Sequence, residues 1–584
     1  MLKDIKRFYG FLMRYKRDFF LFVLVMTSTT ILENIIPYVY KLLVDAAPRG
    51  NYNELTKMVF WFVGLKILVN ALSTLGNYLE LRFVLPASRN ARIMIFKRIQ
   101  DLDFAFHVNK STGFLISTFK RGDNAFYDLS HSINHHIFRI VVGLIVVLFL
   151  FNQITPIIAW LMLIVFIVNT LAGWQLVKFN ISKRKDFNDA EDRVSGIITD
   201  NFINYETVKF FAQEEKEESR LKEEFQDWMK KIWAYTNSFR LMDISIGTLS
   251  NLGILAIFQI VIRKLSLGEI TTGDLVMVIS LMNAFYYRFF DLLYEIREIV
   301  KQQTDIHNYF DILDNEILIK DPEIPAQVKD IKGRVQFQQV SFMYPDNQQN
   351  VLNNVNLDIQ PGESIAFIGR SGAGKTTLIK LLLRFYDVSQ GEILIDGIDI
   401  RNFTKAQLRS FIGVVPQEPI LFNNTIGFNV AYGKNKATQL QIQEACHLAN
   451  LDEFIESLPS KYETEVGERG IKLSGGQKQR LAIARMILSN PKIIVFDEGT
   501  SNLDSESEHL IQDALWKVAK NRTVLIIAHR FSTVRKVDRA IVMDKGEIIE
   551  SGTHAELMKK AGLYSYLREM QYQDQKFIDP NPEK

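Results

Sequence analysis

The chain has 584 residues but only one cysteine, Cys446. A single cysteine excludes an intramolecular disulfide and any metal site built from several cysteines. Strong charge of either sign is missing as well: 69 Lys and Arg stand against 66 Asp and Glu, so there is no basic excess of the kind that nucleic acids attract. We expect Cys446 to be a small buried residue and no nucleic acid to be a partner.

Charged residues are absent from residues 140–177, a run of 38 positions without Asp, Glu, Lys or Arg. A membrane-spanning helix needs about 20 apolar residues, so this run predicts two spans joined by a turn at residues 152–156. Arg139 and Lys178 flank the pair and place both outer ends on the cytoplasmic side. A soluble domain with buried helices is the alternative, but the run is too long for an ordinary core hairpin.

Four further apolar segments bring the expected number of spans to six. They are residues 19–44, 58–84, 244–262 and 275–300, with internal charges at Glu33, Lys41, Lys66, Glu80, Arg288, Asp291 and Glu295. Such charges have to face a bundle interior or a wet cavity. Two long, basic helical regions, residues 86–128 and 179–240, are expected in the cytoplasm, while Arg263 and Lys264 fall outside against the trend.

Residues 1–17 are basic and aromatic, which is typical of a helix lying at a membrane surface. They do not have the pattern of a cleavable signal. Asp4 also argues against an acid-poor transit peptide. We therefore expect a multi-pass protein of a bacterial inner membrane.

The glycine-rich segment GRSGAGKT, residues 369–376, fits the pattern G-x-x-x-x-G-K-[ST]. An apolar strand is expected before it at residues 364–367 and a helix after it at residues 377–385. Glycines let the backbone N–H groups point into one concavity, and the helix adds its positive end, so the loop suits phosphate. The residues expected around the phosphates are Gly369, Ser371, Gly372, Ala373, Gly374, Lys375, Thr376 and Thr377. A glycine-rich turn without a ligand is the alternative.

Within this loop Lys375 is expected to reach the β- and γ-phosphates and Thr376 to coordinate Mg²⁺. A second strand, residues 493–496, ends in Asp497 and Glu498. Asp497 is expected to act on the metal through water and Glu498 to polarise the attacking water. The alternative is that Asp497 and Glu498 are an ordinary acidic pair on a solvated loop.

His529 follows a third apolar strand, residues 523–528. An imidazole there can hydrogen-bond a γ-phosphate without adding a fixed charge. A single histidine after a strand is more often structural, so the assignment depends on the neighbouring motifs.

The motif LSGGQ, residues 473–477, precedes a helical run at residues 478–488 and forms another helix N-terminus suited to a phosphate. With the phosphate loop and this motif together, residues 333–571 resemble the ATP-binding-cassette superfamily. The resemblance implies the cofactors ATP and Mg²⁺ and further site residues: Tyr344 stacking on adenine, Gln417 touching Mg²⁺, the signature residues Ser474, Gly475, Gly476 and Gln477, and Asp504 in the D-loop.

The usual DEATSALD reads DEGTSNLD here, with Gly499 and Asn502 replacing alanines. Neither change removes a catalytic group, but both put coupling across the dimer in question. TEVGERG at residues 464–470 resembles a loop of the superfamily's exporters that contacts the membrane domain. Cys446 as the sole cysteine argues against the leading cysteine-peptidase domain of some peptide exporters.

Each motif occurs once, and the resemblance implies that the signature loop meets the γ-phosphate on a partner chain. The expected fold is an all-α membrane domain of six helices followed by an α/β P-loop ATPase cassette. The expected parts are residues 1–315 (membrane domain), 316–332 (linker), 333–572 (cassette) and 573–584 (polar tail). We expect a dimeric half-transporter, most simply of identical chains, that exports or flips a substrate; an ATP-gated channel and a soluble cassette ATPase are the alternatives.

The polar extensions are expected to end in short coupling helices, with candidates at residues 106–115 and 204–211.

Three segments bear on the substrate. NYETVKFF, HVNKSTGFL and RGDNAF are similar to segments of half-transporters linked to iron–sulfur export and heavy-metal tolerance. That group binds glutathione-type anions through an arginine cluster, in which Asn180 replaces one arginine here while Arg184 keeps another. The group's proline–leucine–asparagine element is also missing from the sixth span. A lipid or amphipathic drug therefore stays open beside a glutathione or metal conjugate.

Two polar clusters in the membrane domain have no assigned role. Asn283, Tyr287, Arg288 and Asp291 recur near helical spacing among aromatics and suit an amphipathic ligand, or an Arg288–Asp291 pair with plain aromatic packing. His131, His135 and His136 suggest a metal, but we assign no acidic or cysteine partner to complete such a site. The sequence therefore favours an ordinary helix-end position for the three histidines.

Overall fold

The computed structural model describes residues 2–110, 112–345, 347, 349–498, 505–528 and 530–578. The chain forms two compact units. The helical unit comprises Met1–Leu102 and Lys110–Glu316, and the cassette unit comprises Asp103–Asn109 and Ile317–Lys584. The short segment Asp103–Asn109 thus belongs structurally with the cassette, although both of its neighbours in sequence belong to the helical unit.

The helical unit consists of long helices joined by short helical segments. They are α1 (Leu2–Leu12), η1 (Met13–Tyr15), α2 (Lys16–Ala46), η2 (Ala47–Arg49), α3 (Tyr52–Asp101), α5 (Thr112–Ser130), η3 (His131–Ile137), α6 (Phe138–Ile154), α7 (Pro156–Ile203), α8 (Tyr205–Phe210), α9 (Glu214–Ser266) and α10 (Thr272–Asp314). Among the described residues, five helical stretches are long and apolar enough to cross a membrane: Lys3–Ala46, Tyr52–Asp101, Gly113–Ile154, Pro156–Ile203 and Glu214–Ser266. The sixth expected span falls in α10, whose described apolar part is Thr272–Tyr286.

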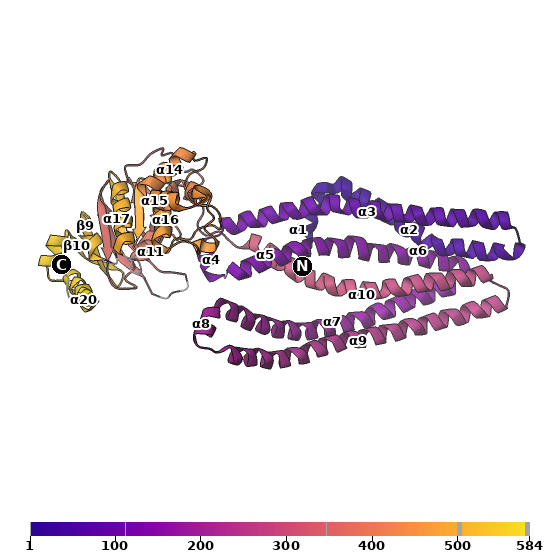
Figure 1. Ribbon diagram of the computed structural model, residues 1–584. Helices are drawn as coiled ribbons and strands as arrows, with labels where there is room; N and C mark the ends of the chain where they lie inside the picture. The colour runs from indigo at the N-terminus through magenta and orange to yellow at the C-terminus, as the bar shows by residue number, and fades with distance from the viewer. Residues whose placement is uncertain are drawn as a thin grey trace. The chain divides into compact units, whose positions relative to one another are not determined.

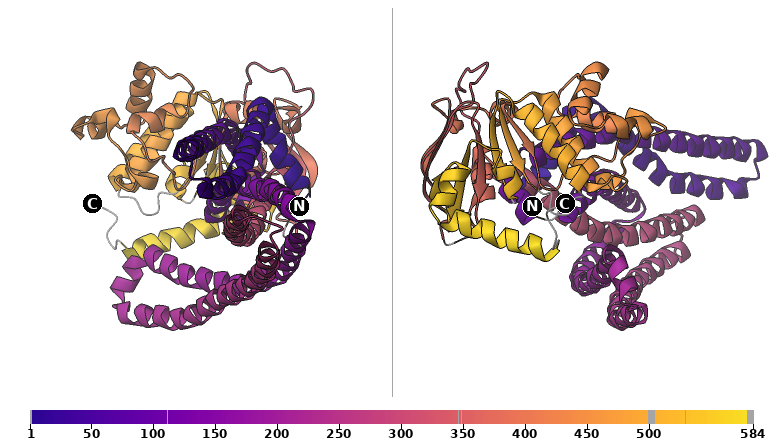
Figure 2. Two further views of the ribbon diagram at one scale, coloured as in Figure 1. Left: turned by 90° about the vertical axis from the view of Figure 1, so that its right-hand side faces the viewer. Right: turned by 60° about the vertical axis from the view of Figure 1, so that its left-hand side comes forward.

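The charge-free run forms two helices, as predicted. Thr155 adopts an extended conformation between α6 and α7, and Pro156 begins α7, where its missing N–H costs nothing. Helix α7 continues well beyond its apolar part, lies beside α9 along its length and joins it through α8 (Figures 1 and 2). The polar extensions are therefore direct continuations of the spanning helices.

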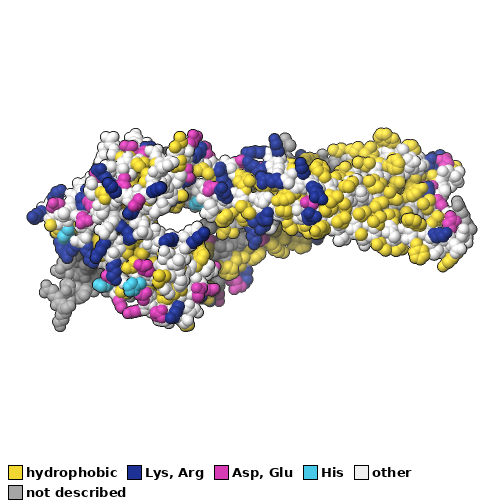
Figure 3. All heavy atoms as spheres, turned by 90° about the horizontal axis from the view of Figure 1, so that it is seen from above, with side chains coloured by type: hydrophobic (Ala, Val, Ile, Leu, Met, Phe, Trp, Pro, Cys, Tyr) yellow, Lys and Arg dark blue, Asp and Glu magenta, His cyan; other side chains and the backbone are white. Residues whose placement is uncertain are grey.

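Part of the outer surface of the helical unit is apolar. Hydrophobic side chains gather over much of it in Figure 3, and large exposed examples are Phe60, Trp61, Ile145, Phe149 and Trp160. A water-soluble protein rarely exposes such a continuous apolar surface, whereas lipid tails accept it. This surface fits a lipid bilayer.

Inside the helical unit, packing is tight where glycine permits it. A Cβ on Gly122 of α5 would lie 2.3 Å from Cγ of Tyr309 on α10, and Tyr309 is fully buried. Helix α1 also packs inwards: Phe8 is buried against Phe126, and Phe11 stacks on Phe310. The aromatic face that suggested a surface helix is therefore covered by protein.

The cassette unit contains two sheets and the helices around them. Its elements are α4 (Phe104–Asn109), β1 (Val335–Phe342), β2 (Leu352–Ile359), β3 (Ser364–Ile368), α11 (Lys375–Leu382), β4 (Gln390–Ile395), β5 (Ile398–Asp399), η4 (Ile400–Asn402), α12 (Lys405–Phe411), β6 (Ile412–Val415), α13 (Ile426–Ala431), α14 (Gln439–Leu448), α15 (Asp452–Ser457), η5 (Lys461–Glu463), η6 (Glu468–Gly470), α16 (Gly475–Ser489), β7 (Ile493–Asp497), α17 (Ser505–Ala519), β8 (Thr523–Ile527), α18 (Phe531–Val534), β9 (Arg539–Asp544), β10 (Glu547–Gly552), α19 (His554–Lys559) and α20 (Leu563–Ile578). The four-stranded sheet has the order β2-β1-β4-β5 and the six-stranded sheet the order β10-β9-β3-β8-β7-β6.

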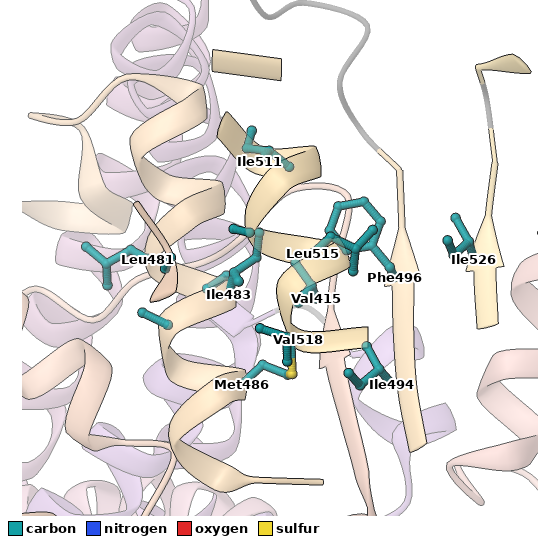
Figure 4. Close-up of a cluster of buried hydrophobic side chains, with 14 of the residues drawn as sticks. Val415, Leu481, Ile483, Met486, Ile494, Phe496, Ile511, Leu515, Val518 and Ile526 are labelled. Atoms are coloured by element: carbon teal, nitrogen blue, oxygen red, sulfur yellow. The ribbon is translucent and has the colours of Figure 1, made fainter. Parts of the chain in front are cut away.

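In the larger sheet, β9, β3, β8, β7 and β6 run parallel. Their carboxyl ends consequently share one edge, which is where ligands bind in open α/β sheets. Helices α16 and α17 cover one face of this sheet through the cluster drawn in Figure 4, which includes Ile483, Phe496 and Leu515. Helix α16, which begins in the LSGGQ motif, therefore packs on the same sheet whose strand β3 leads into the phosphate loop.

Candidate functional site

The phosphate loop joins β3 to α11, as the sequence predicts. Every residue of β3 is buried, and Gly374 caps α11 with φ of +98°. A Cβ on Gly369 would lie 2.1 Å from the carbonyl oxygen of Met543, so the loop presses against β9. These two positions need glycine, one for its backbone conformation and one for the close approach. The helix starts at Lys375, two residues earlier than expected.

Lys375 is 7% exposed, and its ammonium lies across the loop. Its Nζ donates to the carbonyl oxygens of Gly369 and Arg370 at 2.7 and 2.9 Å. Burial lowers the pKa of Lys375, and the negative charge of Asp497 opposes that shift. A desolvated cation inside a loop of N–H donors is an arrangement that phosphate oxygens fit. Thr376, the next residue, is exposed.

The two acidic residues stand at the same edge of the sheet. Asp497 is the last residue of β7 and is half-buried, whereas Glu498 is 2% exposed. One carboxylate oxygen of Glu498 accepts the backbone N–H of Arg530 at 3.1 Å, and the other accepts the hydroxyl of Thr533. Thr533 belongs to none of the motifs found in the sequence, so its contact with Glu498 could not be predicted from them.

Gln417 and Tyr344 lie at two other points of the site. Gln417 is exposed and follows β6, which also ends at the ligand edge. The hydroxyl of Tyr344 lies 3.1 Å from the hydroxyl of Thr377, so this ring stands next to the first turn of α11. Tyr386 meets Tyr344 edge to face at 5.1 Å.

The signature loop forms a capping box at the start of α16. The side chain of Ser474 accepts the N–H of Gln477 at 3.3 Å, and the side-chain oxygen of Gln477 accepts the N–H of Ser474 at 2.9 Å. A Cβ on Gly476 would lie 2.8 Å from the side chain of Ser507, which fixes the loop against α17. Gly475 is exposed at the helix N-terminus. Asp504 and His529 lie outside the described residues, as do Gly499 and Asn502.

Sequence reasoning missed one aromatic contact. Helix α4 begins at Phe104, two residues before the candidate coupling segment, and the remainder of that segment enters α5. The ring of Phe104 stacks on Phe385 at 4.6 Å, and Lys380 of α11 lies over it at 5.8 Å. The carboxylate of Asp103 accepts the N–H of Leu318 at 2.6 Å and so fixes α4 to the cassette unit. The second candidate matches α8, where Tyr205 and Phe210 are exposed.

The predicted linker also packs on the cassette. The N–H of Ala326 donates to the carbonyl oxygen of Asn402 at 2.8 Å, and Val328 joins the core formed by the smaller sheet and α11. Cys446 is fully buried in α14, as expected. Burial raises the pKa of its thiol to about 12, so the thiol is inert.

Comparison with known proteins supports this organisation over almost the whole chain. Residues 19–289 match the family described as the ABC transporter transmembrane region, and residues 352–501 match that described as ABC transporter. The "ATM1-type heavy metal exporter" of Novosphingobium aromaticivorans is 34% identical over 558 residues, which are 93% of this chain and 90% of that protein. The chain belongs to the ABC transporter family.

A solved structure described as a bacterial Atm1-family ABC exporter with ATP bound matches with a TM-score of 0.85 and 32% identity. The match covers 96% of this chain and 98% of the solved chain. The mouse "ATP-binding cassette sub-family B member 6" is 34% identical over 94% of this chain, and this chain spans 66% of the length of that relative. One membrane domain followed by one cassette is the half-transporter architecture of this family.

Proposed function

We propose that this chain is one half of an ATP-driven exporter, with each ATP held between residues 369–376 of one chain and residues 473–477 of the other. The chain has one phosphate loop, at the N-terminus of α11, and one signature loop, at the N-terminus of α16. Two identical chains related by a twofold axis would each supply the half-site that the other lacks. A different partner chain is the other possible composition.

One observation carries the hydrolytic assignment: the phosphate loop follows β3, and Asp497 and Glu498 lie at the end of β7, so all three stand at one edge of the parallel sheet. In the proposed site Lys375 holds the β- and γ-phosphates and Glu498 orients the attacking water. Thr376, Gln417 and Asp497 would hold Mg²⁺, which neutralises charge on the phosphates. The exposed side chains of Thr376 and Gln417 and the half-buried Asp497 fit a hydrated cation. His529 and Asp504 keep their predicted roles beside the γ-phosphate and at the dimer contact.

Movement of the cassette would reach the membrane helices through α4. Helix α11 begins at Lys375 in the phosphate loop, and Lys380 on the same helix lies over the ring of Phe104. A shift of the loop around ATP is therefore passed along one rigid helix to the segment that joins α3 to α5. Closure of two cassettes around ATP would turn the substrate cavity of the transporter outwards. Hydrolysis of ATP and release of the products would return the cavity to its starting orientation.

For the substrate we propose a metal–thiol conjugate of the glutathione type, since a relative similar over nearly its full length is named a heavy metal exporter. A lipid or amphipathic drug is the alternative. Asn283 and Asp291 are exposed, whereas the side chains of Tyr287 and Arg288 lie outside the described part.

The function is tested in inside-out vesicles of a bacterial inner membrane, where the cassettes face the assay buffer. ATP-dependent uptake of a metal–glutathione complex is expected in vesicles with the wild-type chain and not in vesicles with Lys375→Ala. Uptake of a fluorescent lipid or drug instead would reassign the substrate. Equal uptake in both vesicle types, for every substrate class, would contradict ATP-driven export.

A further inference from the structure

The three histidines of the helical unit lie on one turn of unusual shape. His131, His135 and His136 belong to η3, a π-helical turn in which the N–H of Phe138 reaches the carbonyl oxygen of Ile133, five residues back. In an α-helix, positions 131 and 136 would lie about 140° apart around the axis. The wider π-turn brings them to one face, and such turns are frequent at functional sites. One potential ligand atom from each histidine lies within 4.8 Å of the others.

The acidic partners that the sequence does not place nearby come from two other helices. His131 Nδ1 lies 3.1 Å from a carboxylate oxygen of Glu80 on α3. His136 Nε2 lies 3.7 Å from a carboxylate oxygen of Glu295 on α10. His135 Nε2 lies 3.2 Å from the amide oxygen of Asn77, again on α3. The cluster therefore joins the η3 turn to both neighbouring helices.

Among the residues that the structure describes, two buried polar atoms of this cluster find no hydrogen-bond partner. They are Nδ1 of His135, on a residue that is 7% exposed, and Oε1 of Glu80, on a residue that is 3% exposed. A buried lone pair without a donor costs about 1–3 kcal/mol. Glu80 and Glu295 also place two carboxylates, each more than nine-tenths buried, inside an apolar helical unit. Such a group of acceptors is stabilised by a cation.

We propose that His131, His135, His136 and Glu295 form a binding site for one divalent transition-metal ion, with Glu80 orienting His131. Imidazole and carboxylate ligands together suit Zn²⁺, and a carboxylate on the second nitrogen of a ligand histidine is the usual supporting contact. The ion would tie the η3 turn to α3 and α10. Its binding requires neither ATP nor the export function proposed above.

The spacing is compatible with a zinc ion after small side-chain movements. Bonds of about 2.0–2.1 Å at tetrahedral angles place ligand atoms about 3.3 Å apart. The contact between His136 and Glu295, at 3.7 Å, is already close to that value. The histidine atoms, at up to 4.8 Å, have to approach by rotation of their rings. The side chains of His131 and His136 are 38% and 36% exposed, which leaves a path for the ion to enter.

The test is a zinc titration of the purified full-length chain in lipid nanodiscs, after treatment with a chelator and without nucleotide. One Zn²⁺ per chain is expected, together with X-ray absorption showing nitrogen and oxygen ligands at about 2.0–2.1 Å. Mg²⁺ at the same concentration should not compete. Glu80→Gln should weaken binding roughly 10- to 100-fold, the usual effect of losing a supporting carboxylate. His135→Asn should weaken it further.

The matched control is His447→Asn, which removes an exposed histidine that also contacts a carboxylate, Asp452. This control should bind Zn²⁺ like the wild type. If His135→Asn does not elute as the wild type does, His131→Gln takes its place because the His131 ring is partly exposed. Zinc should also raise the unfolding temperature of the wild type but not of the ligand variants. Absence of stoichiometric binding, or equal affinity in the wild type and the ligand variants, would overturn the proposal.

Discussion

The backbone N–H of Arg530 donates to Oε2 of Glu498 at 3.1 Å. Thr533, one helical turn further on, donates its hydroxyl to the other carboxylate oxygen. Both oxygens of Glu498 are thus held by the beginning of α18. A carboxylate oxygen can accept more than one hydrogen bond, so Glu498 can hold the attacking water while these contacts orient it. In the proposed mechanism the position of α18 would therefore set where Glu498 points.

Glu498→Gln should keep ATP binding and lose hydrolysis. The amide keeps the shape of the side chain but is a poor base, and loss of a positioned base typically costs about 10²–10⁴-fold in rate. Phosphate release and binding of a fluorescent ATP analogue in nanodiscs measure the two properties separately. Glu453→Gln, at an exposed position of α15, is the control and should hydrolyse ATP normally. Normal turnover in Glu498→Gln would remove Glu498 from its role.

Phe104→Ala should uncouple hydrolysis from movement of the membrane helices. The variant loses the stacked contact with Phe385, whereas the phosphate loop is untouched. A spin label at Leu267→Cys, an exposed position between α9 and α10, reports the separation of the two chains. The ATP-induced change in that distance should shrink while hydrolysis continues. Phe106→Ala, on the same short helix, is the control, and an equal loss in both variants would contradict a specific role for Phe104.

Gly122→Ala should destabilise the helical unit. Its new methyl group would lie 2.3–2.5 Å from atoms of the buried Tyr309 side chain. Overpacking of this kind costs about 1–3 kcal/mol and outweighs the gain of about 0.5–1 kcal/mol from replacing a helical glycine. Gly196→Ala, which meets nothing within 4 Å, is the matched control and should be as stable as the wild type or slightly more so. Thermal unfolding in detergent compares the two, and equal midpoints would contradict the tight α5–α10 contact.

Cys446 should resist thiol reagents in the folded chain. The thiolate is the reactive form, and burial raises the pKa of the Cys446 thiol to about 12, so very little of it is ionised at pH 8. Labelling with a maleimide should therefore be slow at pH 8, rise with pH, and become rapid after denaturation. Rapid labelling of the native chain would show that α14 opens to solvent.

The local features of the chain are visible in its sequence. The strand before the phosphate loop, the hairpin at Pro156 and the strand ending in Asp497 each depend on neighbouring residues alone, and the structure has all three. Their hydrophobic runs and turn residues act within a few positions of each other. The sequence also separates the membrane helices from the cassette, because lipid-facing helices need long apolar runs.

Contacts between distant segments were not predictable in the same way. Phe104 and Phe385 belong to different expected domains, and only the fold places one ring on the other. Glu80 lies 51 positions before His131, so a search for acidic residues near the histidines does not find it. A π-turn leaves no simple pattern in the sequence either. Pairings of this kind follow from which helices pack together, and one sequence does not give that.

In the proposed dimer each ATP site is built from two chains. Lys375→Ala removes the phosphate contact and Ser474→Arg blocks the signature loop, so either variant alone should be inactive. In a mixed dimer, one site combines both defects and the other is intact. With random pairing of equal amounts, ATP hydrolysis should return to about a quarter of the wild-type rate. No recovery in purified mixed dimers carrying two different tags would contradict the composite site.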